Sequence, residues 1–101
     1  MAESSTAPSR RDCPVASTPA EAWTAFRTKL KAADAVLFFT PEYNRTISGA
    51  LKNAIDVGSR PWGQSVWDGK PAAVVSQSPG AQGGFGANHN TRQAVVFLNV
   101  P

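Results

Sequence analysis

The sequence predicts an α/β fold built on parallel strands. Two apolar runs, AVLFF at residues 35–39 and PAAVVS at residues 71–76, have the length of strands and lack the alternation of a half-exposed sheet. A helical pattern lies between them, within roughly 30 residues, which is the size of a strand–helix–strand unit. Strands joined through a helix run parallel, so we expect their carboxyl ends to lie at one edge of the sheet.

Length, charge and composition limit the possible functions. The chain has 101 residues, 42% hydrophobic and 17% charged, which fits one globular domain and argues against disorder throughout. The net charge of +3 comes from scattered basic residues, which do not predict nucleic-acid binding. No apolar run approaches membrane-spanning length, and no secretion signal is recognisable. The single cysteine, Cys13, cannot form an intramolecular disulfide, which fits a cytoplasmic location.

The first helix is predicted to begin at residue 18. Residues 1–17 lack hydrophobic periodicity, so we interpret them as a mobile leader in front of a domain at residues 18–101. Thr18, Pro19 and Glu21 match a capping box with proline at the first helical position. The apolar residues that follow recur at spacings of three and four and share one face: Trp23, Phe26, Leu30 and Ala33.

Two further helices complete the pattern. Ser48 is a suitable N-cap for a helix over residues 49–57, with a buried stripe formed by Leu51, Ala54 and Ile55. Lys52 and Asp56 are expected to form a surface pair on that helix. A last helix is predicted at about residues 90–99. Because residues 95–98 are all apolar, we expect this helix to be packed deep in the protein.

Each predicted strand ends in an unusual loop. The first loop begins with Pro41, which stiffens the chain, and continues with Tyr43 and Asn44, which combine an aromatic ring with polar groups. The second loop, residues 77–90, carries four of the eight glycines, at positions 80, 83, 84 and 86. Open α/β sheets bind ligands at the carboxyl ends of their strands. The two loops are therefore compatible with a planar ring, either a flavin or a nucleotide base.

Several spaced motifs together resemble the NADPH-dependent FMN reductase family. They are PEYNRTISGALKNAID at residues 41–56, SRP at 59–61, WDGKP at 67–71, SQSPGAQGG at 76–84 and FLN at 97–99. This flavodoxin-like group includes quinone, chromate and azo-dye reductases. The likeness runs from about Pro19 to Pro101, and the agreement of several motifs in order is far more specific than a lone glycine pattern.

The resemblance implies a flavodoxin-like three-layer αβα fold with a parallel sheet. It also implies a truncated chain, in which the first two strands, the last strand and the phosphate-binding loop of the family are missing. The implied function is that of a flavoprotein, an NAD(P)H-dependent oxidoreductase with FMN and NADPH as cofactors and a quinone, chromate, azo or flavin acceptor. The implied assembly is a homodimer or homotetramer, with the helix after the first strand and residues 59–61 near the interface. We expect neither nucleic-acid nor membrane partners.

The resemblance also implies which residues bind the cofactor. The turn at residues 42–44 would contact the isoalloxazine ring of FMN largely through backbone groups, and the loop at 78–84 would flank the same ring. The expected cofactor-binding residues are Pro41, Glu42, Tyr43, Asn44, Thr46, Ser78, Pro79, Gly80, Gly83 and Gly84. Because the cofactor carries the chemistry, we expect no catalytic side chain and no metal ligand.

Two other functions compete with this interpretation. A non-catalytic fragment, or interaction piece, could have lost FMN binding together with the phosphate-binding loop. A general nucleotide-binding module is disfavoured, because no GxGxxG motif follows a strand and no Walker lysine motif occurs.

Overall fold

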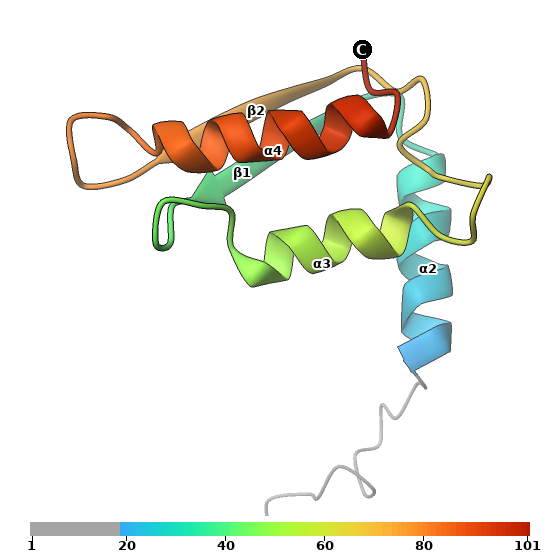
Figure 1. Cartoon of the computed structure of the whole chain (residues 1–101). Coiled ribbons are helices and arrows are strands. Elements are labelled where there is room, and N and C mark those ends of the chain that lie inside the picture. The colour runs from blue at the N-terminus through green and yellow to red at the C-terminus, as the bar shows by residue number, and fades with distance from the viewer. Residues whose placement is uncertain (1–18) are drawn as a thin grey trace, which may run out of the picture.

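The computed structural model describes residues 19–101, which form three helices and two strands (Figure 1). In chain order these are α2 (Pro19–Lys31), β1 (Val36–Pro41), α3 (Gly49–Gly58), β2 (Ala72–Gln77) and α4 (Phe85–Phe97). The expected leader at residues 1–17, which includes Cys13, and the capping residue Thr18 lie outside the described residues. None of the described helices has the length and apolar character needed to span a membrane.

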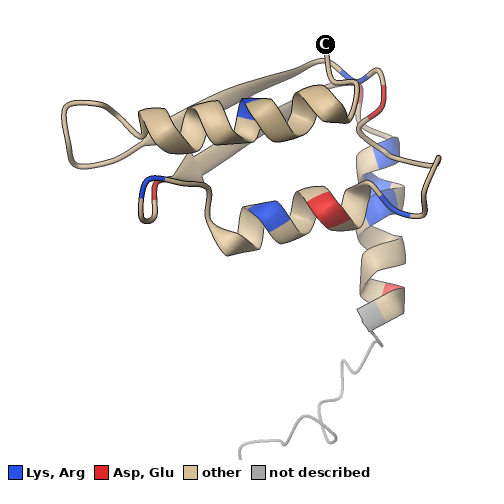
Figure 2. Cartoon of the chain, viewed as in Figure 1, with Lys and Arg blue, Asp and Glu red and all other residues tan. Residues whose placement is uncertain are grey.

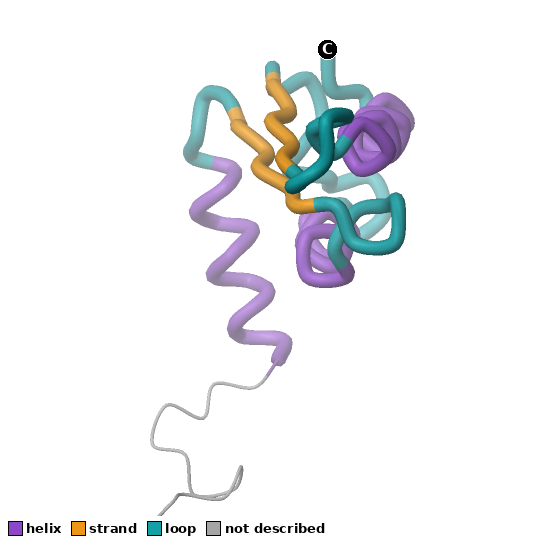
Figure 3. The backbone as a smooth tube through the Cα atoms, turned by 90° about the vertical axis from the view of Figure 1, so that its left-hand side faces the viewer, coloured by secondary structure: helices purple, strands orange, loops and turns teal. Residues whose placement is uncertain are grey.

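The two strands form a parallel sheet, as predicted. Val36 lies opposite Ala72, and Pro41 lies opposite Gln77. Both α3 and α4 lie on one side of this sheet (Figure 3). Within the described residues the other side is open, and its large side chains are exposed: Leu37 by 53%, Phe39 by 64% and Val75 by 43%. The α/β class is confirmed, and this chain supplies the sheet and the helical layer on one of its faces.

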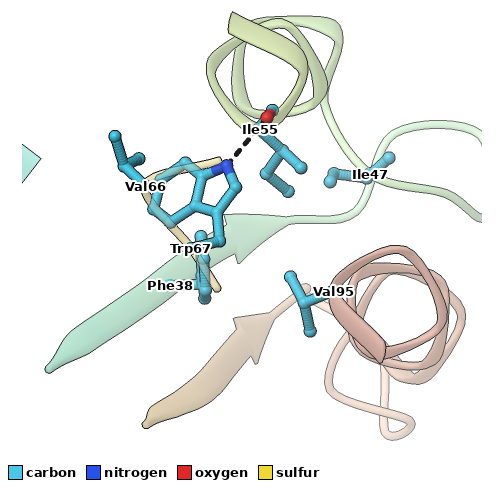
Figure 4. Close-up of a cluster of buried hydrophobic side chains, with 6 residues drawn as sticks. All are labelled: Phe38, Ile47, Ile55, Val66, Trp67 and Val95. Atoms are coloured by element: carbon cyan, nitrogen blue, oxygen red, sulfur yellow. Dashed lines mark hydrogen bonds between the residues drawn. The ribbon is translucent and has the colours of Figure 1, made fainter. Parts of the chain in front are cut away.

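A tryptophan joins β1 to α3 in the hydrophobic core. The core consists of Phe38, Ile47, Ile55, Val66, Trp67 and Val95 (Figure 4). Trp67 is 2% exposed and its ring centroid lies 5.4 Å from that of Phe38. Its Nε1–H donates a hydrogen bond of 2.8 Å to the carbonyl oxygen of Ile55. The indole therefore buries a large apolar area while its polar group remains bonded.

The end of α3 is shaped to receive this indole. A Cβ atom added to Gly58 would lie only 2.6 Å from three ring atoms of Trp67. Any larger residue at this position would push the ring away from the helix. Gly58 is therefore required for close packing between the helix backbone and the aromatic ring.

The first helix docks through its carboxyl-terminal half. Phe26 and Leu30 pack against the core as expected, whereas Trp23 is 45% exposed. Arg27 Nε donates to the carbonyl oxygen of Val57 at 2.8 Å, which ties α2 to α3. Lys70 Nζ donates to the carbonyl oxygen of Ala33 at 2.6 Å, just beyond the end of α2. A positive charge at this position also interacts favourably with the helix dipole.

Most predicted boundaries agree with the structure to within two residues. Ser48 caps α3 as expected, because its Oγ accepts a hydrogen bond of 3.2 Å from the Leu51 N–H. Lys52 and Asp56 form the expected surface pair, with Nζ and Oδ1 separated by 2.8 Å.

The prediction for the last helix is wrong in two respects. The helix begins at Phe85 rather than at about residue 90, because Gly84 reverses the chain with a φ of 78°. Val95 is buried, but Val96 and Phe97 are 70% and 78% exposed. Only one face of α4 contacts the rest of the described chain, so four consecutive apolar residues cannot all be covered.

We expect Gly58→Ala to lower the free energy of unfolding by about 1–3 kcal/mol, because the added methyl group overpacks the site of Trp67. Gly49→Ala is the matched control at the other end of α3, where an added Cβ meets no atom within 4 Å. The control should change the free energy by less than ~1 kcal/mol. Urea denaturation followed by tryptophan fluorescence measures both values, and equal losses would contradict the packing described for Gly58.

Candidate cofactor site

The parallel pairing brings two loops together at the carboxyl edge of the sheet. Residues 42–48 follow β1, and residues 78–84 follow β2. An open cavity of about 420 Å³ lies at this edge, lined by residues 39–41 and 75–79. Three of the residues expected to bind a cofactor, Pro41, Ser78 and Pro79, are in its wall.

The sheet supplies the apolar part of the cavity. Phe39 and Val75 point to the uncovered side of the sheet and contribute side chains that are more than 40% exposed. Sequence reasoning missed both residues, because it treated the strands as covered on both faces. The odd-numbered residues of each strand share this face, but neighbouring positions are equally apolar, so the sequence does not show which face is uncovered.

The first loop contains a tight turn with a strained tip. Tyr43 and Thr46 exchange two backbone hydrogen bonds of 3.0 Å each. Between them, Asn44 and Arg45 have left-handed φ values of 51° and 67°, a conformation that non-glycine residues adopt only where the surrounding structure stabilises it. Tyr43 is 59% exposed, and neither Tyr43 nor Asn44 lines the cavity. Tyr43 is therefore exposed at the base of the turn, and Asn44 lies at its tip.

The second loop folds back onto the end of β2. Ser76 Oγ donates to the carbonyl oxygen of Gly83 at 2.9 Å, and the Gly84 N–H donates to Ser78 Oγ at 3.1 Å. A Cβ on Gly84 would lie 3.1 Å from the backbone nitrogen of Gln77. Gly84 therefore lets the loop approach the strand closely.

Gly80 differs from the other glycines of this loop. Its φ lies outside the left-handed region, and a Cβ there would meet only Ser78 Oγ, at 3.9 Å. Neither the backbone conformation nor the internal packing of the chain requires a glycine at this position. The missing side chain leaves open space beside the backbone, next to Ser78 of the cavity wall.

Three side-chain contacts connect the first loop to the second and to α4. Glu42 Oε2 accepts a hydrogen bond of 3.2 Å from the Ala87 N–H. Arg45 Nη1 donates to Gln82 Oε1 at 3.0 Å, and Thr46 Oγ1 donates to Asn90 Oδ1 at 2.7 Å. The expected side-by-side arrangement of the two loops is confirmed. Arg45, Gln82 and Asn90 were not among the expected site residues, because no local pattern predicts contacts between separate loops.

The site carries little charge. Figure 2 shows no charged residue in the loop between β2 and α4, and residues 42–48 contain one acid and one base, Glu42 and Arg45. Residues 19–101 contain no group of acidic, histidine or cysteine side chains that could hold a metal ion. An apolar wall, two prolines and accessible backbone groups fit an uncharged heteroaromatic ring such as isoalloxazine.

The chain is similar to flavin-dependent reductases. Residues 5–101 match the family model described as NADPH-dependent FMN reductase. A quinone reductase of Pseudomonas putida is 66% identical over 86 residues, which cover 85% of this chain and 46% of the relative. An NAD(P)H-dependent FMN reductase of Pseudomonas aeruginosa is 52% identical over 75 residues, or 74% of this chain and 40% of the relative.

A solved structure has the same fold. FerB, a flavoenzyme NAD(P)H:(acceptor) oxidoreductase from Paracoccus denitrificans, matches with a TM-score of 0.76 and 39% identity. The match covers 89% of this chain and 46% of FerB. The chain thus spans just under half the length of these relatives.

We expect Gly84→Ala to lower the free energy of unfolding by about 1–2 kcal/mol, because alanine is strained at a positive φ and would crowd the end of β2. Gly80→Ala is the matched control in the same loop and should shift the value by less than ~0.5 kcal/mol. Thermal and urea unfolding monitored by circular dichroism compare the two variants. A loss at Gly80 as large as that at Gly84 would show that the loop has a different conformation.

Proposed function

Because this chain belongs to the NADPH-dependent FMN reductase family, we propose that its two loops hold the isoalloxazine ring of FMN in an NAD(P)H-dependent oxidoreductase. One observation carries the proposal: a largely apolar cavity lies at the carboxyl edge of the sheet, lined by the last residues of β1 and β2 and by the first residues of the loop after β2. Ligands of open α/β sheets bind at this edge.

The ten expected residues take three roles in this proposal. Pro41, Ser78 and Pro79 form the wall against which the ring lies. Tyr43 and Asn44 reach the ring from the turn, while Gly80, Gly83 and Gly84 bring backbone groups close to it. Glu42 and Thr46 hold the turn against α4 through the contacts described above. The task of these residues is to orient the ring and to keep water from one of its faces.

The chemistry comes from the cofactor. When bound, FMN supplies the two-electron transfer that carries reducing equivalents from NADPH to an acceptor. We take a quinone as the first acceptor to test, because the relative from Pseudomonas putida is named a quinone reductase. Chromate, azo and flavin acceptors are the alternatives. The proposed site of action is the cytoplasm, where the reduced pyridine nucleotide is available.

One observation favours a second function, that of a non-catalytic interaction piece. The open face of the sheet exposes Leu37, Phe39 and Val75 side by side on two strands. A contiguous exposed apolar surface commonly marks a contact with another polypeptide. A flavin-binding measurement separates the two functions, because an interaction piece needs no cofactor.

We expect the purified chain to bind riboflavin and FMN with dissociation constants that agree within about tenfold, because the described walls contact the ring and Arg45 is the one basic side chain in the two loops. Titration followed by flavin fluorescence measures both constants. Gly80→Val should weaken both by more than about tenfold by filling the space beside the ring, whereas Gly49→Val should not.

In the presence of FMN, one NADPH and one proton should be consumed for each benzoquinone reduced to hydroquinone.

The flavin site would be contradicted if the protein gives the circular dichroism spectrum of a folded chain but retains no flavin absorbance after incubation with millimolar FMN. That result would favour the interaction piece. Flavin binding without NADPH oxidation would retain the site but contradict the reductase activity.

We also propose that the chain forms a homodimer or homotetramer through the surface around Trp62. Trp62 and Phe97 are 76% and 78% exposed, and both line a second cavity of about 350 Å³. The guanidinium of Arg60 lies 5.7 Å from the centre of the Trp62 ring. Exposed aromatic residues with a neighbouring arginine are typical of subunit interfaces.

We expect Trp62→Ser to raise the dissociation constant of the oligomer by at least about tenfold, because buried tryptophans dominate interface energies. Trp23→Ser is the matched control, since it removes another partly exposed tryptophan from α2. Sedimentation velocity over a concentration series measures the association. A chain that stays monomeric at high concentration, or a Trp62 variant that associates normally, would contradict this interface.

A further inference from the structure

The helix that follows the second loop lacks a cap of its own. The N-cap residue of α4 is Gly84, which has no side chain and makes no side-chain capping bond. The first N–H groups of any helix have no partner inside the helix, and an N-cap side chain normally accepts from the second or third of them. The third residue of α4 is Ala87, and its N–H donates to Glu42 Oε2 at 3.2 Å. A carboxylate 45 residues away in the sequence takes the place of the missing cap.

The carboxylate is enclosed where it meets the helix. The Glu42 side chain is only 9% exposed, whereas the nearby Arg45 side chain is 75% exposed and its Nη1 lies 3.8 Å from Glu42 Oε1. A Cβ on Gly86 would meet the backbone carbonyl oxygen of Arg45 first and would also lie 2.8 Å from Glu42 Oε2, so the glycine at the second helical position makes room for both the turn and the carboxylate. A negative charge at a helix N-terminus is also favoured by the helix dipole.

This contact joins the start of the first loop to the end of the second loop, where α4 begins. Glu42 is the first residue after β1, and Gly84 is the last residue of the loop after β2. Any movement of the start of α4 away from the turn at residues 42–46 breaks the bond to Ala87. The Glu42 side chain therefore helps to hold the turn and the glycine loop at a fixed distance, together with the bonds from Arg45 to Gln82 and from Thr46 to Asn90.

We propose that Glu42 is a positioning residue whose carboxylate caps α4 and thereby sets the separation of the two loops that enclose the flavin ring. This inference rests on the proposed function and extends it: the side chain of Glu42 acts on the second loop, beyond any backbone contact with the cofactor.

Two substitutions at Glu42 test the proposal. Glu42→Ala removes the acceptor and should weaken riboflavin and FMN binding by at least about fivefold. Glu42→Gln keeps an oxygen that can accept from Ala87 and should bind within about threefold of the unchanged protein. Asp34→Ala is the matched control, because it removes an exposed carboxylate from the loop before β1, and it should leave flavin affinity unchanged.

Amide hydrogen exchange gives a readout that does not depend on the cofactor. In Glu42→Ala the Ala87 amide should exchange at least about tenfold faster, while amides in β1 and β2 keep their protection. Glu42→Gln should retain most of the protection at Ala87, and it also provides the comparison if the alanine variant fails to fold.

The outcomes separate this inference from the proposed function. If the unchanged protein binds no flavin, the proposed function fails and the positioning role fails with it, while exchange at Ala87 still decides whether Glu42 caps the helix. If the unchanged protein binds flavin and Glu42→Ala binds equally well, the positioning role is overturned and the proposed function stands. A loss in Glu42→Gln as large as that in Glu42→Ala would overturn the capping explanation.

Discussion

The parallel pairing of β1 with β2 is the constraint on which the candidate site depends. Because Val36 is aligned with Ala72 and Pro41 with Gln77, the two strands end at the same edge, and the loops that follow them must start side by side. One face of this sheet is covered by α3 and α4 (Figure 3). Trp67 provides that contact, since its indole packs on Phe38 and Gly58 and donates to the Ile55 carbonyl.

The two loops contribute to the site in different ways. The turn after β1 is held by its own backbone bonds between Tyr43 and Thr46, and the loop after β2 is held by the hydroxyl groups of Ser76 and Ser78. The candidate site is thus built mainly from backbone groups and uncharged side chains, and in the proposed function the bound cofactor supplies the chemistry. The contacts from Glu42, Arg45 and Thr46 then set the position of one loop relative to the other.

The open face of the sheet presents an apolar surface that either a cofactor or another polypeptide could cover. Leu37, Phe39 and Val75 lie on this face, and two of the three residues also line the candidate cavity. A ring bound at the strand ends would cover part of this apolar surface, whereas a second polypeptide could cover all of it. The same residues thus serve either a cofactor site or a protein contact, and flavin binding by the purified chain distinguishes the two.

Local sequence patterns determined much of the fold. The capping hydroxyl of Ser48, the lysine–aspartate pair on α3 and the apolar runs of both strands each depend on residues within a few positions of one another. The parallel order and the location of the candidate site followed from these elements and from general rules of α/β topology, and the reductase family followed from the spaced motifs.

Only the tertiary structure decided how the start of α4 is capped, which strand face is covered and why Gly58 must be a glycine. In each case the deciding contact joins separate elements of the fold: Glu42 after β1 with Ala87 in α4, the helices with one side of the sheet, and Trp67 with Gly58 at the end of α3. Helix capping and amphipathic periodicity describe the interactions of a residue with its near neighbours. A cap supplied from another loop leaves no local pattern in the sequence. The capping role of Glu42 can therefore be recognised only in the folded chain, where its carboxylate contacts the start of α4.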